Sequence, residues 1–349
     1  MANAKSLIRP LADFSEEEPE WLVDGLIPKG QITLLASDGG VGKTSTWVAL
    51  VAAISAGERC FLDAGGVARD PQKVLFLTTE DSVSKKLKKR LREAGANQNN
   101  IFAPDYAGDR DGVLQKLKFG TPEMADLIRT YTPALVVFDP LQGFLPPELN
   151  MGSRNAMRNC LQPLLSLGEE TGTTFLIVCH TNKRKAAYGR DRLADSADIW
   201  DISRSVLMMG FTEEQGVRYL SHEKSNYSEL QETKLFTIDK FGVITQTGTS
   251  WKRDREYQQA QADASSAPTK EACKEWILNY ISDHGGNVPL KELDKTAEDY
   301  GFLRKTLKRS KQELAADGKT KSYNQGYGNQ KVWYIKRFEP EPEQIELPY

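Results

Sequence analysis

Short apolar runs alternate with stretches of helical period over residues 20–248. Four runs are rich in β-branched residues or leucine and show little alternation between apolar and polar positions: Gln31–Ala36, Val74–Thr78, Leu135–Asp139 and Thr174–Cys179. Strands that are buried on both faces have this pattern. Residues 20–248 are therefore predicted to form an α/β domain with a mostly parallel sheet covered by helices.

Four further runs extend this sheet. Val206–Met209 keeps the buried pattern and is predicted as a fifth strand. The other three alternate more strongly and are separated by turn residues: Val217–His222, Lys234–Asp239 and Val243–Gln246. Their pattern predicts antiparallel strands at one edge of the sheet. Residues 1–19 form an N-terminal extension before the domain.

A second, smaller domain is predicted at residues 270–338. It follows residues 249–269, which are polar, end in small residues and so favour a linker. Its pattern is helix, extended segment, two helices and a turn-rich hairpin: Lys270–Asp283, Asn287–Leu290, Lys291–Tyr300, Phe302–Ala316 and Lys321–Ile335. Three helices followed by a hairpin is the plan of a winged helix. Residues 339–349 are acidic and proline-rich, which predicts a disordered tail.

The segment after the first strand has the chemistry of a phosphate-binding loop. Ser37–Thr44 matches the Walker A pattern with Ser37 in place of the first glycine, and Thr46–Ile54 continues as a helix. Such a loop turns N–H groups toward phosphates, while Lys43 neutralises them and the Thr44 hydroxyl binds Mg²⁺. The alternative is an unrelated glycine-rich turn. The predicted ATP-binding residues are Ser37, Asp38, Gly39, Gly40, Val41, Gly42, Lys43, Thr44 and Ser45.

Three later strands end in polar residues that suit ATP hydrolysis. Asp139 ends an apolar strand as a Walker B carboxylate does, and is predicted to hold water-bridged Mg²⁺. Glu80 is predicted as the general base that polarises the attacking water, although a helix cap or surface acid is the alternative. His180 is predicted to sense the γ-phosphate, and a core histidine is its alternative.

Taken in order, these segments resemble a known family. WLVDGLIPKGQITLLASDGGVGKT, TTED, LVVFDPL, FLIVCHTNK and DSADIWDISRSV are similar to RecA-like P-loop ATPases of the plasmid RepA helicase type, over roughly residues 18–246. The resemblance implies a homo-hexameric ring with ATP between neighbours, Glu80 as catalytic glutamate and His180 as sensor. It also implies Arg204 as an arginine finger supplied in trans, and Lys224 near the neighbour's γ-phosphate. Arg190 and Arg192 compete for the finger role, and a surface ion pair is the alternative.

Two loops that follow the later strands carry basic residues. Gln142–Asn159 contains Arg154 and Arg158, and Asn182–Asp195 has a local charge of +3. The basic residues of the second loop are Lys183, Arg184, Lys185, Arg190 and Arg192. Basic loops at this edge suit the backbone of single-stranded DNA, and solvated charge is the alternative.

The third helix and hairpin of the second domain are also basic. Phe302–Arg337 has a local charge of +8. Its basic residues are Arg304, Lys305, Lys308, Arg309, Lys311, Lys319, Lys321, Lys331, Lys336 and Arg337. These side chains suit the DNA backbone, and Tyr323, Asn324, Gln325 and Tyr327 are placed to reach a groove or stack on bases. A winged helix that docks on protein is the alternative.

Composition narrows the cellular setting. The chain of 349 residues is 39% hydrophobic and 27% charged, as in ordinary globular proteins. Its four cysteines lack metal-binding spacing, which indicates a reducing compartment. The N-terminus has no apolar signal region, and no run of about 18 apolar residues occurs. These features predict a cytoplasmic protein with no membrane span.

The sequence thus predicts an ATP- and Mg²⁺-dependent motor that acts on DNA, a helicase or translocase of a phage or mobile element. One alternative is a nucleotide-switched helicase loader or DNA-binding regulator. Another is a signalling or scaffold ATPase without a nucleic acid partner.

Overall fold

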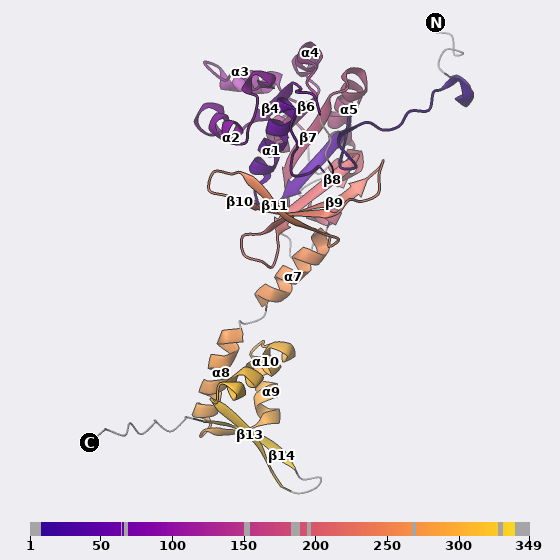
Figure 1. Ribbon diagram of the computed structural model, residues 1–349. Helices are drawn as coiled ribbons and strands as arrows, with labels where there is room; N and C mark the ends of the chain where they lie inside the picture. Colours follow the sequence, from indigo (N-terminus) through magenta and orange to yellow (C-terminus); the bar gives the residue numbers. More distant parts are fainter. Residues whose placement is uncertain are drawn as a thin grey trace. The chain divides into compact units, whose positions relative to one another are not determined.

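The computed structural model describes residues 8–63, 65, 69–149, 154–182, 189–193, 197–266, 270–326 and 331–338. The chain divides into two compact units, residues 1–259 and 260–349 (Figure 1). Each unit has a hydrophobic core of its own. The predicted N-terminal extension is exposed from residue 8 to residue 19 and contains one short 3₁₀ helix, η2 (Leu11–Asp13).

Within the described part of the first unit, one sheet has nine strands in the order β11-β10-β9-β8-β3-β7-β6-β4-β5. The strands from β8 to β5 in this order are parallel, and β9, β10 and β11 continue the sheet in antiparallel fashion. The prediction of a mostly parallel sheet with an antiparallel edge is confirmed. The strand bounds are β3 (Ile32–Ser37), β4 (Val74–Thr78), β5 (Ile101–Phe102), β6 (Leu135–Asp139), β7 (Thr174–His180), β8 (Ser205–Phe211), β9 (Arg218–Ser225), β10 (Thr233–Ile238) and β11 (Ile244–Ser250). A separate pair is formed by β1 (Trp21–Val23) and β2 (Ile27–Pro28).

Helices surround this sheet in the first unit. The α-helices are α1 (Lys43–Ala56), α2 (Lys88–Glu93), α3 (Arg110–Lys116), α4 (Pro122–Tyr131), α5 (Arg154–Thr171) and α6 (Ala197–Ile202). A further helix, α7 (Asp254–Ser266), begins in this unit and ends beyond it. The shorter helical turns are η3 (Val83–Leu87), η4 (Gln98–Asn100), η5 (Leu141–Phe144) and η6 (Gly189–Arg192). Among the described residues, no helix is both long and apolar enough to span a bilayer.

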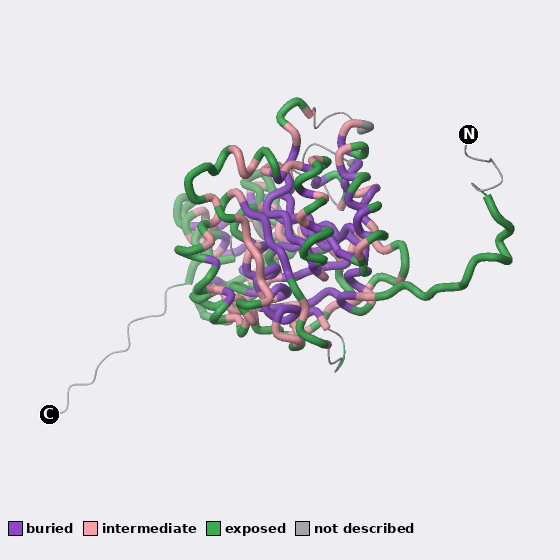
Figure 2. Tube along the Cα trace, turned by 90° about the horizontal axis from the view of Figure 1, so that it is seen from above, coloured by how far each residue is buried: buried purple, intermediate pink, exposed green. Residues whose placement is uncertain are grey.

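The central strands lack alternation because helices cover both faces of the sheet. Phe138 of β6 lies in a buried cluster with side chains of α4 and α5. Its neighbour Val137 points to the other face and lies in a cluster with side chains of α1 and α2. In Figure 2 the buried stretches of the chain, in purple, lie inside and the exposed ones surround them. Apolar residues at successive positions of one strand therefore fill two cores, one on each face.

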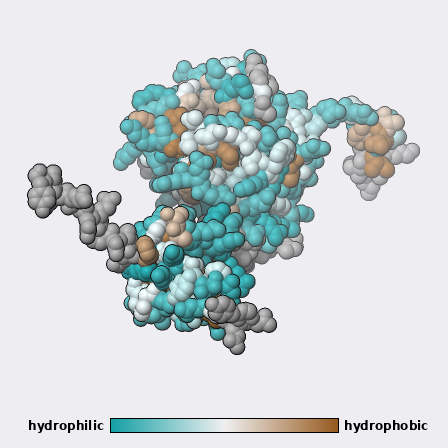
Figure 3. Space-filling view, turned by 60° about the horizontal axis from the view of Figure 1, so that its bottom comes forward, coloured by the Kyte–Doolittle hydropathy of each residue, from teal (hydrophilic) through white to brown (hydrophobic). Residues whose placement is uncertain are grey.

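The second unit is a small α/β arrangement with its own core. In chain order it contains α8 (Lys270–Asp283), β12 (Asn287–Pro289), α9 (Leu290–Asp299), α10 (Arg304–Ala316), β13 (Thr320–Gln325) and β14 (Val332–Arg337). Its described strands form an antiparallel sheet in the order β12-β14-β13. Leu293, Leu307 and Ile335 from three elements meet in the core. The surface seen in Figure 3 is mostly hydrophilic, as expected when apolar side chains are held in these cores.

The structure differs from the predicted linker at 249–269. The range begins with the last residues of β11 and continues as α7, and the first unit extends to Gln259. Asp254 is fully buried and Tyr257 is nearly so, with its ring stacked on Tyr219 at a centroid distance of 4.3 Å. The polar composition that suggested a linker therefore includes side chains that pack against the sheet. The predicted acidic tail, 339–349, lies outside the described residues.

Candidate active site

Four parallel strands bring polar side chains to one edge of the sheet. The register pairs Ser37 of β3 with His180 of β7, and Thr78 of β4 with Asp139 of β6. The phosphate loop follows β3, and Glu80 lies two residues beyond the end of β4. Since the carboxyl ends of parallel strands meet at one edge, these groups share the place where open α/β sheets bind ligands.

The phosphate loop ends in a backbone shape that requires glycine. Gly42 has a φ of 116° and Gly40 a φ of 78°, a region that residues with a Cβ rarely adopt. A Cβ at Gly42 would also overlap the Ile238 side chain of β10. Gly42 is the N-cap residue of α1, and no side chain caps the helix there. The first N–H groups of α1 are therefore directed toward the loop, where an anion can accept from them.

Lys43, the first residue of α1, is buried beneath this loop. Its ammonium donates to the Ser37 carbonyl oxygen at 2.9 Å and to the Asp38 carbonyl oxygen at 3.0 Å. Burial lowers the pKa of Lys43, and nearby anionic groups including Asp139 oppose that shift. The cation is thus held against the phosphate loop by two backbone carbonyls.

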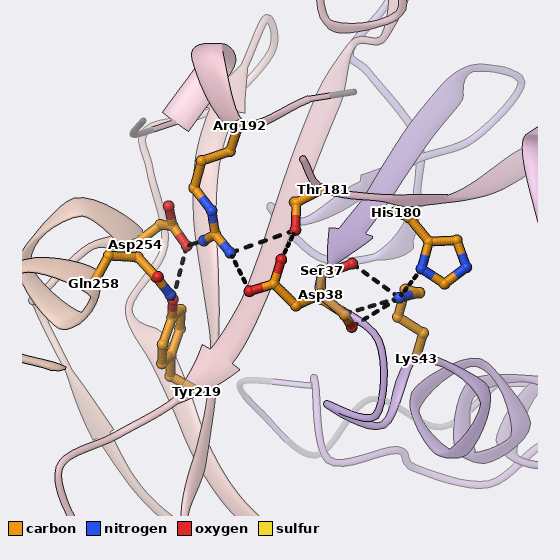
Figure 4. A network of polar contacts seen from close by, with 9 residues as sticks. All are labelled: Ser37, Asp38, Lys43, His180, Thr181, Arg192, Tyr219, Asp254 and Gln258. Atoms are coloured by element: carbon orange, nitrogen blue, oxygen red, sulfur yellow. Dashed lines mark hydrogen bonds and ion pairs between the residues drawn. The ribbon is translucent and has the colours of Figure 1, made fainter. Parts of the chain in front are cut away.

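His180 lies between Lys43 and Glu80. The Lys43 Nζ is 3.2 Å from His180 Nδ1, and His180 Nε2 is 3.8 Å from Glu80 Oε1. Figure 4 shows the contact between Lys43 and His180. An ammonium can only donate, so Nδ1 accepts and Nε2 carries the ring proton of the neutral imidazole. That proton is on the side of the Glu80 carboxylate. Lys43, His180 and Glu80 therefore form one electrostatically linked row along the edge.

Asp139 is held by a tryptophan that the sequence reasoning missed. The fully buried Trp47 of α1 donates from Nε1 to Asp139 Oδ2 at 2.7 Å. Burial raises the pKa of Asp139, whereas the bond from Trp47 lowers it. Trp47 stands four residues after Lys43, which places both on the same face of α1. That spacing was the available signal for Trp47.

Thr44 and Asp139 fit the binding of Mg²⁺ as a partner of ATP. Both supply oxygen, which Mg²⁺ prefers, and Mg²⁺ commonly takes few protein ligands because it keeps waters and binds substrate phosphates. No cluster of three or more histidine, cysteine or acidic side chains that could hold a metal occurs in the described residues. When bound, Mg²⁺ would neutralise charge on the β- and γ-phosphates.

Arg204 and Lys224 are not brought to this edge of their own chain. Arg204 precedes β8, and its N–H donates to the Ile32 carbonyl at the start of β3, the end opposite the phosphate loop. Lys224 of β9 pairs with Val206 at the same end. Its ammonium donates to three carbonyls at the end of α6, at 2.7 to 3.1 Å: those of Trp200, Asp201 and Ser203. In this structure Lys224 therefore caps α6.

The predicted basic loop at Asn182–Asp195 is described only at its two ends. Arg190 pairs with Asp201 at 2.5 Å and stays partly exposed. Arg192 is buried, contrary to its interpretation as a free basic residue or trans finger. Its guanidinium contacts two carboxylates, those of Asp38 and Asp254. Lys183, Arg184 and Lys185 lie outside the described residues, as do Asp195 and the side chain of Arg154 in the earlier loop.

Residues 4–186 match the family described as AAA domain. Over 236 residues the chain is 25% identical to the DNA repair protein RadA of Halalkalibacterium halodurans, covering 67% of this chain and 45% of that protein. It is 22% identical over 233 residues to the DNA repair protein RadA of Helicobacter pylori strain 26695, covering 66% of this chain and 45% of that protein. The chain thus spans less than half the length of these curated relatives.

A solved structure shows a more distant similarity. A KaiC-like protein from Pyrococcus horikoshii OT3 has 17% sequence identity and a TM-score of 0.46, with 65% of this chain and 94% of that chain covered.

The contact between Trp47 and Asp139 predicts a pH-dependent stability difference. In Trp47→Phe the buried carboxylate loses its donor, so its pKa should rise further in the folded state. A raised acid pKa costs stability above the unfolded pKa and costs nothing once the group is protonated in both states. Near pH 7 we expect the free energy of unfolding of the variant to fall by about 1.5–3 kcal/mol, because a hydrogen bond to a charged acceptor is lost. The loss of packing around the ring adds to this value.

Urea unfolding between pH 4 and pH 8 measures this difference. The gap between wild type and Trp47→Phe should narrow as the pH falls through the raised pKa of Asp139. Trp251→Phe, at a position that is 66% exposed, is the matched control and should show a small, constant gap. If the difference in unfolding free energy between wild type and Trp47→Phe did not change with pH, the whole effect of the substitution would come from packing.

Proposed function

The chain belongs to the AAA domain family, and from this premise we propose that it is a RecA-like ATPase that couples ATP hydrolysis to work on DNA. The narrower form of the proposal, carried by the resemblance to RepA-type proteins, is a replicative helicase or translocase of a phage or mobile element. Separation of a forked duplex that requires ATP tests this narrower form.

One observation carries the ATPase part of the proposal. Lys43, Asp139, Glu80 and His180 come from four separate segments and meet at one edge of the sheet, around the N-terminus of α1. A buried strand that ends in Asp, or a glycine-rich turn, is common by itself. A buried lysine, a buried carboxylate and an exposed glutamate at one phosphate loop form the set needed for phosphoryl transfer to water.

Each side chain has a separate task in this reaction. The N–H groups of α1 and the Lys43 ammonium bind the β- and γ-phosphates and offset the charge that develops on them. Glu80, with a side chain that is 59% exposed, accepts a proton from water as the water oxygen bonds to the γ-phosphorus and the bond to ADP breaks. His180 contacts Lys43 and is placed to respond when the γ-phosphate leaves.

Two substitutions separate ATP binding from hydrolysis. Lys43→Ala removes the buried cation and should weaken ATP binding and abolish turnover. Glu80→Gln keeps the shape of the side chain but removes the base, so kcat should fall about 100-fold or more while the Kd for ATP changes little. Calorimetric titration and phosphate release measure the two effects.

Glu93→Gln, which removes a carboxylate of α2 that pairs with Lys89 at the surface, is a matched control and should behave as wild type. Wild-type turnover in Glu80→Gln would show that another group acts as the base.

The second unit supports a DNA partner through the faces of α10 and the β13–β14 hairpin. Leu307 and Leu314 face the core, whereas Lys305, Lys308 and Arg309 are exposed. Cross-strand pairing places Lys321 opposite Lys336 and Tyr323 opposite Tyr334. The two tyrosine rings stack with their centroids 5.8 Å apart. Two cations and two aromatic rings therefore share one face of the hairpin. Exposed cations suit phosphates, and aromatic faces suit unstacked bases.

We propose that this unit is a DNA-binding winged helix. The order of its described elements, α8-β12-α9-α10-β13-β14, supports the proposal, as does the printed name of the RadA relatives, which describes them as DNA repair proteins. Arg304 and Lys311 already pair with Glu298 and Asp294. They are therefore left out of the set of cations assigned to DNA.

Replacing Lys305, Lys308 and Arg309 with Ala should weaken duplex binding and make it less salt-dependent. Each phosphate contact contributes about 0.9 to the slope of log affinity against log salt concentration. Loss of three contacts should therefore flatten the slope by about 2 to 3. Fluorescence anisotropy at several salt concentrations measures this slope.

Lys270→Ala with Lys274→Ala is the matched control, because both lysines already pair with Glu313. Equal slopes for wild type and the triple variant would support a protein-docking role for the unit.

We further propose that ATP is shared between neighbouring copies in a ring and that Arg204 acts on the neighbour's ATP. Support comes from the position of Arg204 at the end of the sheet opposite its own phosphate loop, because a group that acts in trans must face away from its own site. Lys224 is the weaker candidate, since its ammonium is occupied by three carbonyls at the end of α6.

Mixing two inactive variants tests the shared site. Lys43→Ala lacks the phosphate-binding cation and Arg204→Ala lacks the finger, so a mixed assembly forms some interfaces with both groups intact. ATPase activity should therefore reappear on mixing. Mass photometry identifies the dilution at which the wild-type protein is monomeric. Full ATPase activity at that dilution would contradict catalysis in trans.

A further inference from the structure

Arg192 is a buried side chain at the centre of a polar network that the proposed hydrolysis does not use. Its side chain is 4% exposed. The guanidinium bonds to Asp254 through Nη1, and its Nη2 is 3.2 Å from Asp38 Oδ2 and 3.5 Å from Thr181 Oγ1 (Figure 4). These partners belong to three different segments: α7, the phosphate loop and the residue after His180. One side chain therefore joins parts of the chain that are far apart in sequence.

On the nucleotide side, Asp38 is part of the phosphate loop. A carboxylate so close to bound triphosphate would repel it if it turned toward the phosphates. Asp38 is instead turned to Arg192, and its other oxygen accepts from the Thr181 hydroxyl. The Thr181 N–H also donates to the Ser37 carbonyl at 3.1 Å. Arg192 and Thr181 thus neutralise and orient the acidic residue of the loop.

On the other side, Asp254 is the first residue of α7, and its side chain is fully buried. It accepts from the Tyr219 hydroxyl at 2.7 Å, and that hydroxyl accepts from Gln258 Nε2 at 2.9 Å. Burial raises the pKa of Asp254, and the charge of Arg192 opposes this shift. The start of α7 is therefore held by the same guanidinium that contacts the phosphate loop.

The backbone of Arg192 closes the basic segment 182–193. The Asn182 N–H donates to the Arg192 carbonyl at 2.7 Å, and Thr181 forms an antiparallel bridge with Leu193. The two ends of the segment are thus paired next to His180.

An ion pair of this kind is a weak source of stability, because the desolvation of the two buried charges, Arg192 and Asp254, offsets much of their attraction. Asp254 Oδ2 is buried without a hydrogen-bond partner among the described residues. An apolar contact would hold α7 on the sheet at lower cost. What the ions add is a fixed geometry between the phosphate loop and α7.

We propose that Arg192 is a positioning residue: through Asp38 it sets the phosphate loop for ATP hydrolysis, and through Asp254 it transmits the state of that loop to α7. The inference rests on the proposed ATPase function. It assigns to α7, whose last residues lead into the second unit, a response to nucleotide at the first unit's active site.

The test uses the full chain with Asp38→Asn, Arg192→Lys and the double variant. Asn keeps the shape of Asp38 and the Arg192–Asp254 pair, so this variant should fold. Lys keeps the charge but cannot reach both carboxylates with a planar fork. Arg129→Lys is the matched control, because Arg129 makes a two-pronged pair with Glu170 on α4 and α5, away from the site.

Kinetics should separate positioning from simple loss of structure. In each single variant kcat should fall about tenfold, with a smaller change in KM. The reason is that a misplaced loop weakens the stabilisation of the transition state more than it weakens the binding of ATP. The double variant should be little worse than either single variant, because both disrupt one unit. Rates within twofold of wild type in both single variants, or effects that multiply in the double variant, would overturn the proposal.

Hydrogen exchange supplies a readout that does not depend on turnover. Saturating MgADP should slow exchange at the start of α7 as well as in the phosphate loop of wild type. In Asp38→Asn at saturating MgADP, only the loop should be protected. Equal protection of α7 in wild type and variant, or none in wild type, would overturn the link. If the wild type bound MgADP but did not hydrolyse ATP, the ATPase proposal alone would be refuted. The exchange comparison would still decide whether Arg192 connects the phosphate loop to α7.

Discussion

Parallel pairing of β3 with β7 and of β4 with β6 is the constraint on which the site depends. It aligns Ser37 with His180 and Thr78 with Asp139, so that residues far apart in the sequence end at the same edge. A one-residue shift in either register would turn each following side chain to the opposite face. The strands cannot shift in this way, because both of their faces are filled by separate apolar clusters.

Burial makes Lys43, Asp139 and Arg192 depend on particular partners. Lys43 is held by carbonyl oxygens of its own loop, and Asp139 by the indole N–H of Trp47. Arg192 is held by Asp38 and Asp254. In a poorly solvated site, loss of one partner leaves an uncompensated charge, which costs far more than the same loss at the surface. These groups therefore keep fixed positions relative to the phosphate loop.

The two units use charge differently. In the first unit, Lys43 and Arg192 are buried and held by particular oxygen atoms. In the second, α10 turns Leu307 and Leu314 inward, and this leaves Lys305, Lys308 and Arg309 in water. Solvated cations contribute little to folding, but they can exchange counterions for phosphates of a nucleic acid. Buried cations thus suit a site with one geometry, and exposed cations suit a long, uniform polyanion.

The apolar runs alone determined the central strands, because a strand buried on both faces leaves a continuous local pattern, as in Leu135–Asp139. The short strands β1, β2 and β5 were not predicted, since two or three residues carry no such pattern. The phosphate loop could also be predicted locally, because its glycines and Lys43 lie within one short stretch of the sequence. Only the tertiary structure decided the partners of these groups. Nothing local distinguishes Arg192 from the other basic residues of its segment, or Asp254 from the polar residues around it. Their burial depends on α7 packing beside β9, where Tyr219 meets Tyr257. Arg204 and Lys224 were placed from resemblance, and their positions relative to the phosphate loop follow from strand direction, which no local pattern encodes.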